Sequence, residues 1–215
     1  GSRVPFQDPE RINDAMLDVF SQFQNFRFEL GINVNHPIEF WEESINSIKK
    51  LQKLGFKIYN QHPLLKHVND DYETLVKLYS NLRDNDIEAH YLFHAIPMRG
   101  MSHHRTTLKK GYDLANAINS CGDFSGRAKP KYAVLSDIGK IVIYQDTIVD
   151  KRTRDNALLL KSGFSLKDRM KWNPSWKNPP SVELDSKGSM LVWYIDGTDE
   201  KIDYKILEQD FSSRI

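Results

Sequence analysis

The sequence predicts an α/β protein in which parallel strands alternate with helices and a β-rich C-terminal segment follows. Between residues 26 and 120, three apolar runs typical of strands each lead through a polar loop to a stripe of apolar residues at helical spacing. After about residue 125 these stripes give way to short apolar runs. Repeated strand–loop–helix units imply right-handed crossovers and a parallel sheet. We therefore expect βα units over residues 1–125 and β-structure over residues 126–215.

The first helix and the first βα unit are predicted from the spacing of their apolar residues. One face of a helix is marked by Ile12, Ala15, Met16, Val19, Phe20 and Phe23. The run "FRFELGINV" at residues 26–34 is rich in aromatic and branched side chains, as strands are. It ends at Asn-His-Pro, and the next helical stripe contains Trp41, Ile45, Ile48, Leu51 and Leu54 and is closed by Gly55.

Two further units repeat the pattern. The run "FKIYN" (56–60) precedes a helical stripe from Tyr72 to Leu82, and "IEAHYLFHAI" (87–96) precedes one from Leu108 to Ile118. Later runs read as antiparallel or mixed strands: "KYAVLS", "GKIVIYQDT", "NALLLKSG" and "MLVWYIDG". The Pro-rich stretch "MKWNPSWKNPPS" is expected to cover the body of the domain without regular structure.

Composition and charge exclude several classes of protein. The 30 Lys and Arg residues balance 29 Asp and Glu residues, so no general charge attracts nucleic acid or an anionic membrane. With Cys121 as its single cysteine, the chain alone can build neither a disulfide nor a Cys-rich zinc or iron–sulfur site. No apolar run approaches the roughly 20 residues of a membrane span, and the start has no secretory signal. We expect a cytoplasmic protein without nucleic-acid or membrane partners.

Polar side chains gather where the predicted parallel strands end, at residues 35–37, 60–62 and 94–105. In parallel α/β folds, ligands bind at the carboxyl ends of the strands, so these three loops predict a functional rim. Arg105 lies near a predicted helix start, where a guanidinium holds a carboxylate or phosphate, or forms a plain salt bridge. His90 and His94 are four residues apart in a strand, about 13 Å, so we expect no zinc site there.

Lys140 follows Gly139 between two apolar runs in "AVLSDIGKIVIYQD". One interpretation is a turn lysine with a solvated charge. The other is a lysine held for Schiff-base chemistry, which needs desolvation or a nearby cation and a carbonyl cofactor. Apolar alternation through residues 141–143 leaves little room for a fully solvated turn. We therefore expect the Lys140 amine to face a rim formed by Asn60, Gln61 and His94.

At these same residues the chain resembles the lysine 2,3-aminomutase family of radical S-adenosylmethionine (SAM) enzymes. Six stretches recur in the family's order between residue 1 and about residue 145: "GSRVPFQDPERI", "NVNHPIEFWEESI", "GFKIYNQHPLLKHVNDD", "GMSHHRTTLKKG", "SGRAKP" and "IGK". The resemblance implies the C-terminal half of a partial (β/α) TIM-like barrel with a β-rich extension. The other barrel half carries the family's CxxxCxxC motif for the [4Fe–4S] cluster, which this chain lacks. We thus expect a fragment that is inactive alone and holds no metal.

The resemblance also implies the chemistry, a radical 1,2-migration of an amino group that uses S-adenosylmethionine and pyridoxal phosphate (PLP). Lys140 matches the family's PLP lysine, Asn60 and Gln61 match the Asn-Gln pair near S-adenosylmethionine, and His36 lies on the same rim. The implied pocket for the amino-acid substrate is lined by His94, Ile96, Arg105, Leu135 and Asp137.

The expected substrate is not lysine itself. The two aspartates that hold the lysine ammonium in the lysine enzyme align with Ile96 and Leu135, although a different gap brings Asp137 into the second position. A buried, unpaired ammonium would be very costly. A partial barrel also leaves an edge strand, "FELGINV", so we expect a homo-oligomer. The alternative is a non-catalytic ligand- or protein-binding domain that keeps this fold.

Overall fold

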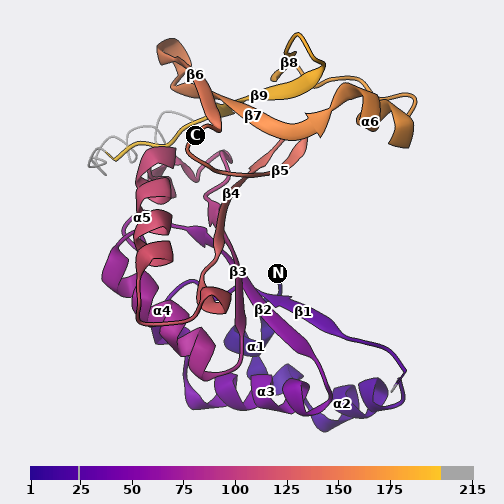
Figure 1. Cartoon of the computed structure of the whole chain (residues 1–215). Helices are drawn as coiled ribbons and strands as arrows, with labels where there is room; N and C mark the ends of the chain where they lie inside the picture. The colour runs from indigo at the N-terminus through magenta and orange to yellow at the C-terminus, as the bar shows by residue number, and fades with distance from the viewer. Residues whose placement is uncertain (24, 200–215) are drawn as a thin grey trace, which may run out of the picture.

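A computed structural model describes residues 1–23 and 25–199 of the chain. The first layer of the fold is a five-stranded sheet in the order β1-β2-β3-β4-β5 (Figure 1). The strands are β1 (Glu29–Ile32), β2 (Lys57–Leu64), β3 (Glu88–His94), β4 (Lys131–Ser136) and β5 (Gly139–Val142). The first four are parallel, and β5 returns antiparallel to β4. The predicted parallel α/β arrangement is therefore confirmed, whereas a barrel half remains a proposal.

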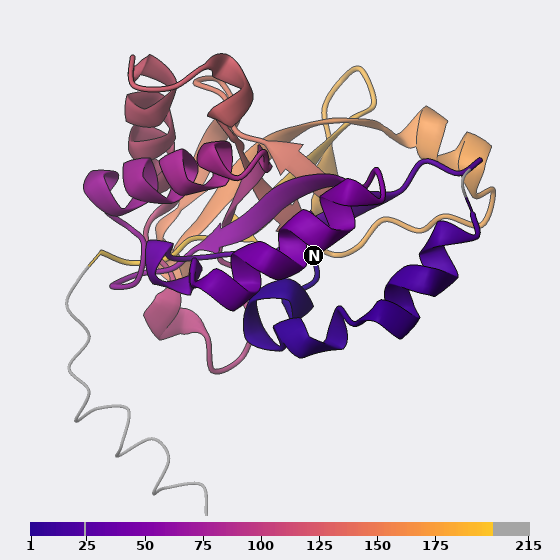
Figure 2. The ribbon, with the colours of Figure 1, turned by 90° about the horizontal axis from the view of Figure 1, so that it is seen from below.

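The longer helices cover one face of this sheet, as Figures 1 and 2 show. The helices are α1 (Val4–Gln7), α2 (Asp14–Ser21), α3 (Glu42–Lys53), α4 (Tyr72–Asp84) and α5 (Leu108–Ser120), with short 3₁₀ turns at Pro9–Arg11, Pro37–Glu39, Ser102–His104, Gly126–Ala128 and Thr153–Asp155. Asp71 begins α4 by accepting a hydrogen bond from the Thr74 amide, and Thr107 does the same for α5. None of the described helices is long and apolar enough to cross a membrane.

A second, antiparallel sheet follows in the order β6-β7-β9-β8. Its elements are β6 (Ile148–Arg152), β7 (Ala157–Ser165), α6 (Leu166–Trp172), β8 (Val182–Leu184) and β9 (Ser189–Ile195). Its inner face packs into the same core as β4 and β5, with Leu160, Val192 and Ile141 all buried. The Pro-rich stretch is partly helical, because α6 includes its first three residues. The sheets change between β5 and β6, so β4 and β5 belong to the first sheet although they follow residue 125. The division expected at residue 125 stays a prediction.

Alternation along the strands gives the first sheet two different faces. In β2, Ile58, Asn60, His62 and Leu64 are buried on the face that the helices cover, while the residues between them are half-buried on the opposite face. We call this opposite side the open face. β1 is an edge strand, as predicted. At its carboxyl end Ser2 pairs with Ile32 in a parallel bridge, and the Ser2 amide donates to the Gly31 carbonyl at 2.7 Å.

Close packing between α5 and β4 gives a first prediction. A Cβ at Gly111 would overlap the Tyr132 hydroxyl and stand 2.9 Å from Cε2 of the same ring. That hydroxyl is buried without a hydrogen-bond partner among the described residues. We expect Gly111→Ala to destabilise the fold by about 2 kcal/mol through overpacking. Tyr132→Phe should cost nothing and should restore part of the loss in the double variant. Urea unfolding measures both, and an additive double variant would contradict the expected contact.

Candidate functional site

The open face carries an aromatic floor formed by Tyr59, Tyr91 and Phe93. The Tyr91 and Phe93 rings stack with centroids 5.2 Å apart and planes 18° from parallel. The Tyr59 ring lies close over Gly31, where a Cβ would stand 3.0 Å from Cε2 of the ring. Glycine therefore permits this aromatic side chain to lie across the edge strand.

Lys140 lies on this floor. Its Nζ is 3.7 Å from the centroid of the Tyr91 ring and 5.2 Å from that of Phe93. The β4–β5 turn makes this possible, because Gly139 has a φ of 119° that other residues rarely adopt. An ammonium over a ring face is attracted by the ring's quadrupole. Lys140 is exposed and forms no ion pair with a described residue, so its amine remains accessible on the open face.

The expected position of Lys140 is partly wrong. Gln61 shares the open face, but Asn60 and His94 are buried on the helix-covered face. Asn60 joins the strand ends: its Oδ1 accepts from the Val34 amide at 2.9 Å, and its Nδ2 donates to the Val34 carbonyl at 3.0 Å. Side-chain alternation separates neighbours such as Asn60 and Gln61 onto opposite faces. Lys140 therefore contacts aromatic rings instead of polar groups.

His94 and Arg105 hold residues 194–199, which we call the strap. The His94 Nδ1 lies 2.8 Å from the Tyr194 hydroxyl. Arg105 is only 3% exposed, and its guanidinium donates to the carbonyls of Ala95 at 2.8 Å, Asp196 at 3.0 Å and Ile195 at 2.5 Å. Among the described residues its side chain therefore forms no salt bridge, and the predicted contact with an anion stays a prediction. Backbone carbonyls some 90 positions away satisfy the guanidinium, and no local pattern indicates them.

Of the remaining predicted site residues, Leu135 and Asp137 lie in the β4–β5 hairpin with Lys140, whereas His36 and Ile96 lie in the loops after β1 and β3. The His36 Nδ1 accepts from the Ile38 amide at 3.2 Å and so begins a 3₁₀ turn. Ile96, 40% exposed, lies in the loop after β3. Leu135 pairs with Lys140 across the β4–β5 hairpin. Asp137 accepts a hydrogen bond from the Ser181 hydroxyl at 2.5 Å. Their proposed roles in substrate binding remain predictions.

Sequence reasoning missed three residues of the open face: Tyr91, Lys131 and His90. Tyr91 pairs with Gln61 on one side and with Lys131 on the other, so the three form a row across the sheet. Partial burial, followed by the positive charges of Lys140 and Lys131, lowers the pKa of His90, while Glu88 and Glu29 oppose the shift. Alternation in "AHYLFH" could have indicated Tyr91 and Phe93, because they have the opposite parity to buried Leu92 and His94.

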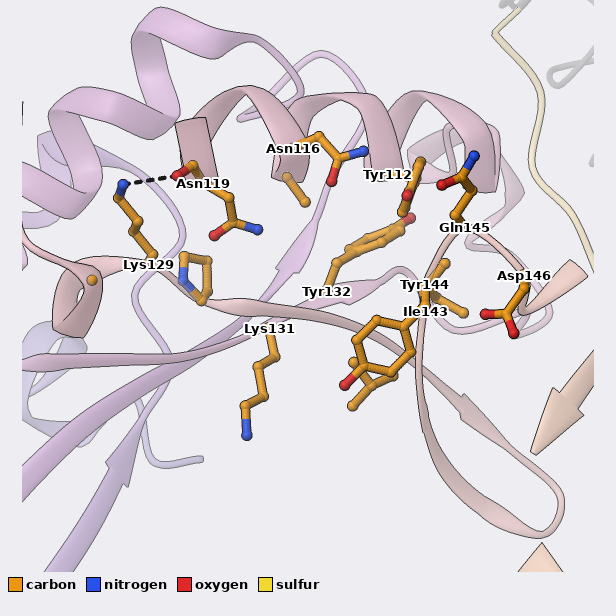
Figure 3. A pocket seen from close by; sticks show the side chains of 14 residues that line it. Tyr112, Asn116, Asn119, Lys129, Lys131, Tyr132, Ile143, Tyr144, Gln145 and Asp146 are labelled. Carbon is orange, nitrogen blue, oxygen red and sulfur yellow. Dashed lines mark hydrogen bonds between the residues drawn. The ribbon is translucent and has the colours of Figure 1, made fainter. Parts of the chain in front are cut away.

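A separate groove of about 820 Å³ lies between α5 and the β4–β5 region (Figure 3). Amide side chains from α5 and from the turn after β5 line it: Asn116, Asn119 and Gln145. In Figure 3, Tyr132 points toward α5, whereas Lys131 points to the other side of β4. The groove is thus on the helix-covered side and does not include Lys140. Among the described residues, no group of three His, Cys, Asp or Glu side chains could hold a metal ion.

The fold and the open face together define an α/β protein that presents an accessible lysine on an aromatic sheet face. A protein of Aquifex aeolicus provisionally named as an L-lysine 2,3-aminomutase is 36% identical over 141 residues, which cover 65% of this chain and 37% of that protein. The L-lysine 2,3-aminomutase of Methanococcus maripaludis is 33% identical over 62% of this chain and 30% of its own length. The glutamate 2,3-aminomutase of Clostridioides difficile is 26% identical over 71% of this chain and 36% of its own.

This chain belongs to the lysine 2,3-aminomutase family. It spans about a third of the length of the curated relatives it matches. No family model matches the chain. A solved radical SAM methyltransferase from Sphaerobacter thermophilus aligns with 54% of this chain and 38% of its own at a TM-score of 0.38 and 13% identity. We draw no conclusion from so low a structural similarity.

Proposed function

We propose that this chain forms part of a radical SAM, PLP-dependent aminomutase that acts on an amino acid other than lysine. The observation that carries the proposal is the Lys140 amine on the floor of Tyr91 and Phe93. Membership of the aminomutase family supports the reaction class. Neither the reaction nor the substrate follows from the fold itself.

The open face fits PLP in three respects. Lys140 offers an accessible amine for covalent attachment of an aldehyde. Tyr91 and Phe93 present ring faces against which a flat aromatic ring can stack. Lys131 offers a positive charge for a phosphate, and the His90 imidazole offers a ring N–H donor. When bound, the cofactor would supply a conjugated ring that spreads charge or an unpaired electron next to the migrating amino group. Lys140 would hold it, and the floor would orient it.

The iron–sulfur cluster does not fit this chain. A [4Fe–4S] cluster is held by several cysteine thiolates, and the sequence contains only one cysteine, Cys121. This residue is buried, and its Sγ lies 3.0 Å from the Asp123 Oδ2. Any cluster must therefore be held by another part of the full-length protein, and we assign no cluster step to residues of this chain. The side-chain amide of Gln61 forms no hydrogen bond with a described residue. It faces the open side, where it could contact S-adenosylmethionine.

The substrate side chain should not be a cation. Ile96 and Leu135 occupy the positions of the family's ammonium-binding aspartates, and Asp137 is engaged by Ser181. Lys140 and Lys131 are already unpaired cations on this face. A third positive charge would be repelled by them, and neither Ile96 nor Leu135 would offer it a carboxylate. A neutral or acidic amino acid meets neither difficulty.

The partner we propose is the other half of the barrel. Over Glu29–Leu30, β1 has no hydrogen-bonded neighbour on its outer side among the described residues. An unpaired edge and a half-buried aromatic face both call for a covering segment or a second copy of the chain. On this view the chain alone binds the cofactor but does not turn over substrate.

Labelling with PLP tests the proposal and is our second prediction. The chain is incubated with PLP, reduced with borohydride and digested, and the modified peptide is mapped. We expect label on Lys140, lost in Lys140→Met and unchanged in the control Lys161→Met, which alters an exposed lysine of the second sheet. Label that is absent from Lys140, or equal on exposed lysines throughout the chain, would contradict the proposal. It would favour a non-catalytic binding domain.

A further inference from the structure

We propose that Lys131 and His90 form an anion subsite beside Lys140, which takes a phosphate or carboxylate group. The inference rests on the proposed function only for the role of Lys140 as the point of covalent attachment. The ligand class is a small carbonyl compound or amino acid that carries an anionic group within reach of that lysine.

Tyr91 is the centre of this subsite. Lys131 is its direct neighbour on β4. The His90 ring lies 4.2 Å from the Tyr91 ring, centroid to centroid, and the Lys140 Nζ lies 3.7 Å from it. Three basic side chains from three strands thus meet around one aromatic residue. An anion above Tyr91 would lie within the reach of all three.

The charge around Tyr91 is not balanced within the described chain. Neither Lys131 nor Lys140 forms an ion pair with a described residue. The acidic groups that act on His90 are Glu88 and Glu29. Glu88 is already paired with Arg127, and Glu29 lies at the amino end of β1. An anion is therefore the missing counter-charge.

The local geometry favours a bound anion over two independent surface lysines beside a neutral imidazole. Tyr59 stands against His90 with ring centroids 5.1 Å apart and limits how far the imidazole can turn away. Lys140 is held by the cation–π contacts with Tyr91 and Phe93. Like charges held near one another repel, and an anion between them removes that repulsion. Charge-assisted hydrogen bonds from Lys131 and His90 would hold it.

Proton NMR of the His90 imidazole tests the subsite without any turnover. Inorganic phosphate and glutarate are titrated into the chain, and the pKa of His90 is followed. We expect phosphate to raise this pKa, because a bound anion offsets the lysine charges. Lys131→Met should weaken the phosphate response about tenfold, the loss of one charge-assisted contact. Lys131→Arg should keep it. The control Lys77→Met alters an exposed lysine on α4, beyond the helix-covered face, and should change nothing.

Two aldehydes distinguish the sources of the anion. If the subsite takes the cofactor phosphate, Lys140 is labelled faster by PLP than by pyridoxal in the wild-type chain, and Lys131→Met removes this difference. If it takes a substrate carboxylate, glutarate raises the pKa of His90 at lower concentration than phosphate does, and the labelling difference persists. Either result supports the subsite. Phosphate and glutarate that both leave His90 unchanged, or an equal effect of Lys77→Met, would overturn it. Failure of either aldehyde to label Lys140 would instead overturn the proposed function.

Discussion

Lowering the pH from 7 to 4 should destabilise the folded chain by several kcal/mol, because His62 and His94 are buried as neutral side chains. Burial lowers the pKa of each to about 4, from an ordinary value of 6.5. The unfolded chain then takes up protons at a higher pH than the folded chain does. Stability is therefore fully present above pH 6.5 and is lost as the pH falls toward 4. Each histidine contributes about 3 kcal/mol to the loss at pH 4.

Both histidines sit in hydrogen-bonded sites on the helix-covered face. The His62 Nε2 lies 2.9 Å from the Tyr79 hydroxyl, which joins β2 to α4. The His94 Nε2 donates to the Thr106 carbonyl at 2.8 Å, and its Nδ1 accepts from the Tyr194 hydroxyl. Both rings are fully buried, so a proton added to either one places a charge out of reach of water.

Urea unfolding at pH 7, 6, 5 and 4 measures this loss. His94→Gln should lower the stability at pH 7 and reduce the loss on acidification by about half, since one of the two titrating groups is removed. His67→Asn is a control, because His67 is exposed at a positive φ of 62° that asparagine tolerates. It leaves both buried histidines in place, so the full loss should remain. If His94→Gln lost as much stability between pH 7 and pH 4 as the wild-type chain does, carboxylates would dominate the pH dependence.

Gly197→Ala should produce the second large effect, by displacing the strap. A Cβ at this position would overlap the carbonyl oxygen of Thr106 and stand 2.6 Å from its carbonyl carbon. The atoms that the Cβ would meet belong to the backbone of Thr106 and Arg105, which cannot move aside as the end of a flexible side chain can. We expect a loss of about 3 kcal/mol in the free energy of unfolding.

The strap is held by contacts that this displacement would break together. The Asp196 carboxylate accepts from the Leu108 amide at 2.7 Å, and that of Asp199 accepts from the Thr107 amide at 3.0 Å. Two acidic groups thus sit at the first turn of α5, where the helix dipole favours negative charge. The Lys66 Nζ donates to the Thr198 carbonyl at 2.7 Å. Loss of the strap removes all of these, together with the acceptors of buried Arg105.

Hydrogen exchange distinguishes local displacement from general destabilisation. The amides of Thr107 and Leu108 should exchange faster in Gly197→Ala, while amides of α3 stay protected. Gly163→Ala is the matched control, because a Cβ at Gly163 meets nothing within 4 Å. It should change neither the stability nor the exchange at α5. Unchanged protection of Leu108 in Gly197→Ala would contradict the strap's role.

Local patterns in the sequence determined the order of elements and the presence of two kinds of sheet. Apolar spacing placed α3, α4 and α5, since a helix must bury a stripe of period 3.6. Short apolar runs after residue 125 likewise indicated antiparallel or mixed strands, of which β4 is parallel to β3 and the later ones are antiparallel. The single cysteine excluded a cluster held by this chain. These properties depend on neighbours within one or two turns, or on composition alone.

Only the tertiary structure decided which polar residues meet. Asn60 and Gln61 are adjacent in the chain, yet their side chains lie on opposite faces, because a strand turns successive side chains to opposite faces. Asn60 is buried and bonds to the Val34 backbone, whereas Gln61 faces the open side. Arg105 finds its acceptors at Ile195 and Asp196, and Lys140 finds its ring at Tyr91, through pairings that span many intervening residues. Such contacts depend on how distant strands and loops pack, which local periodicity does not encode.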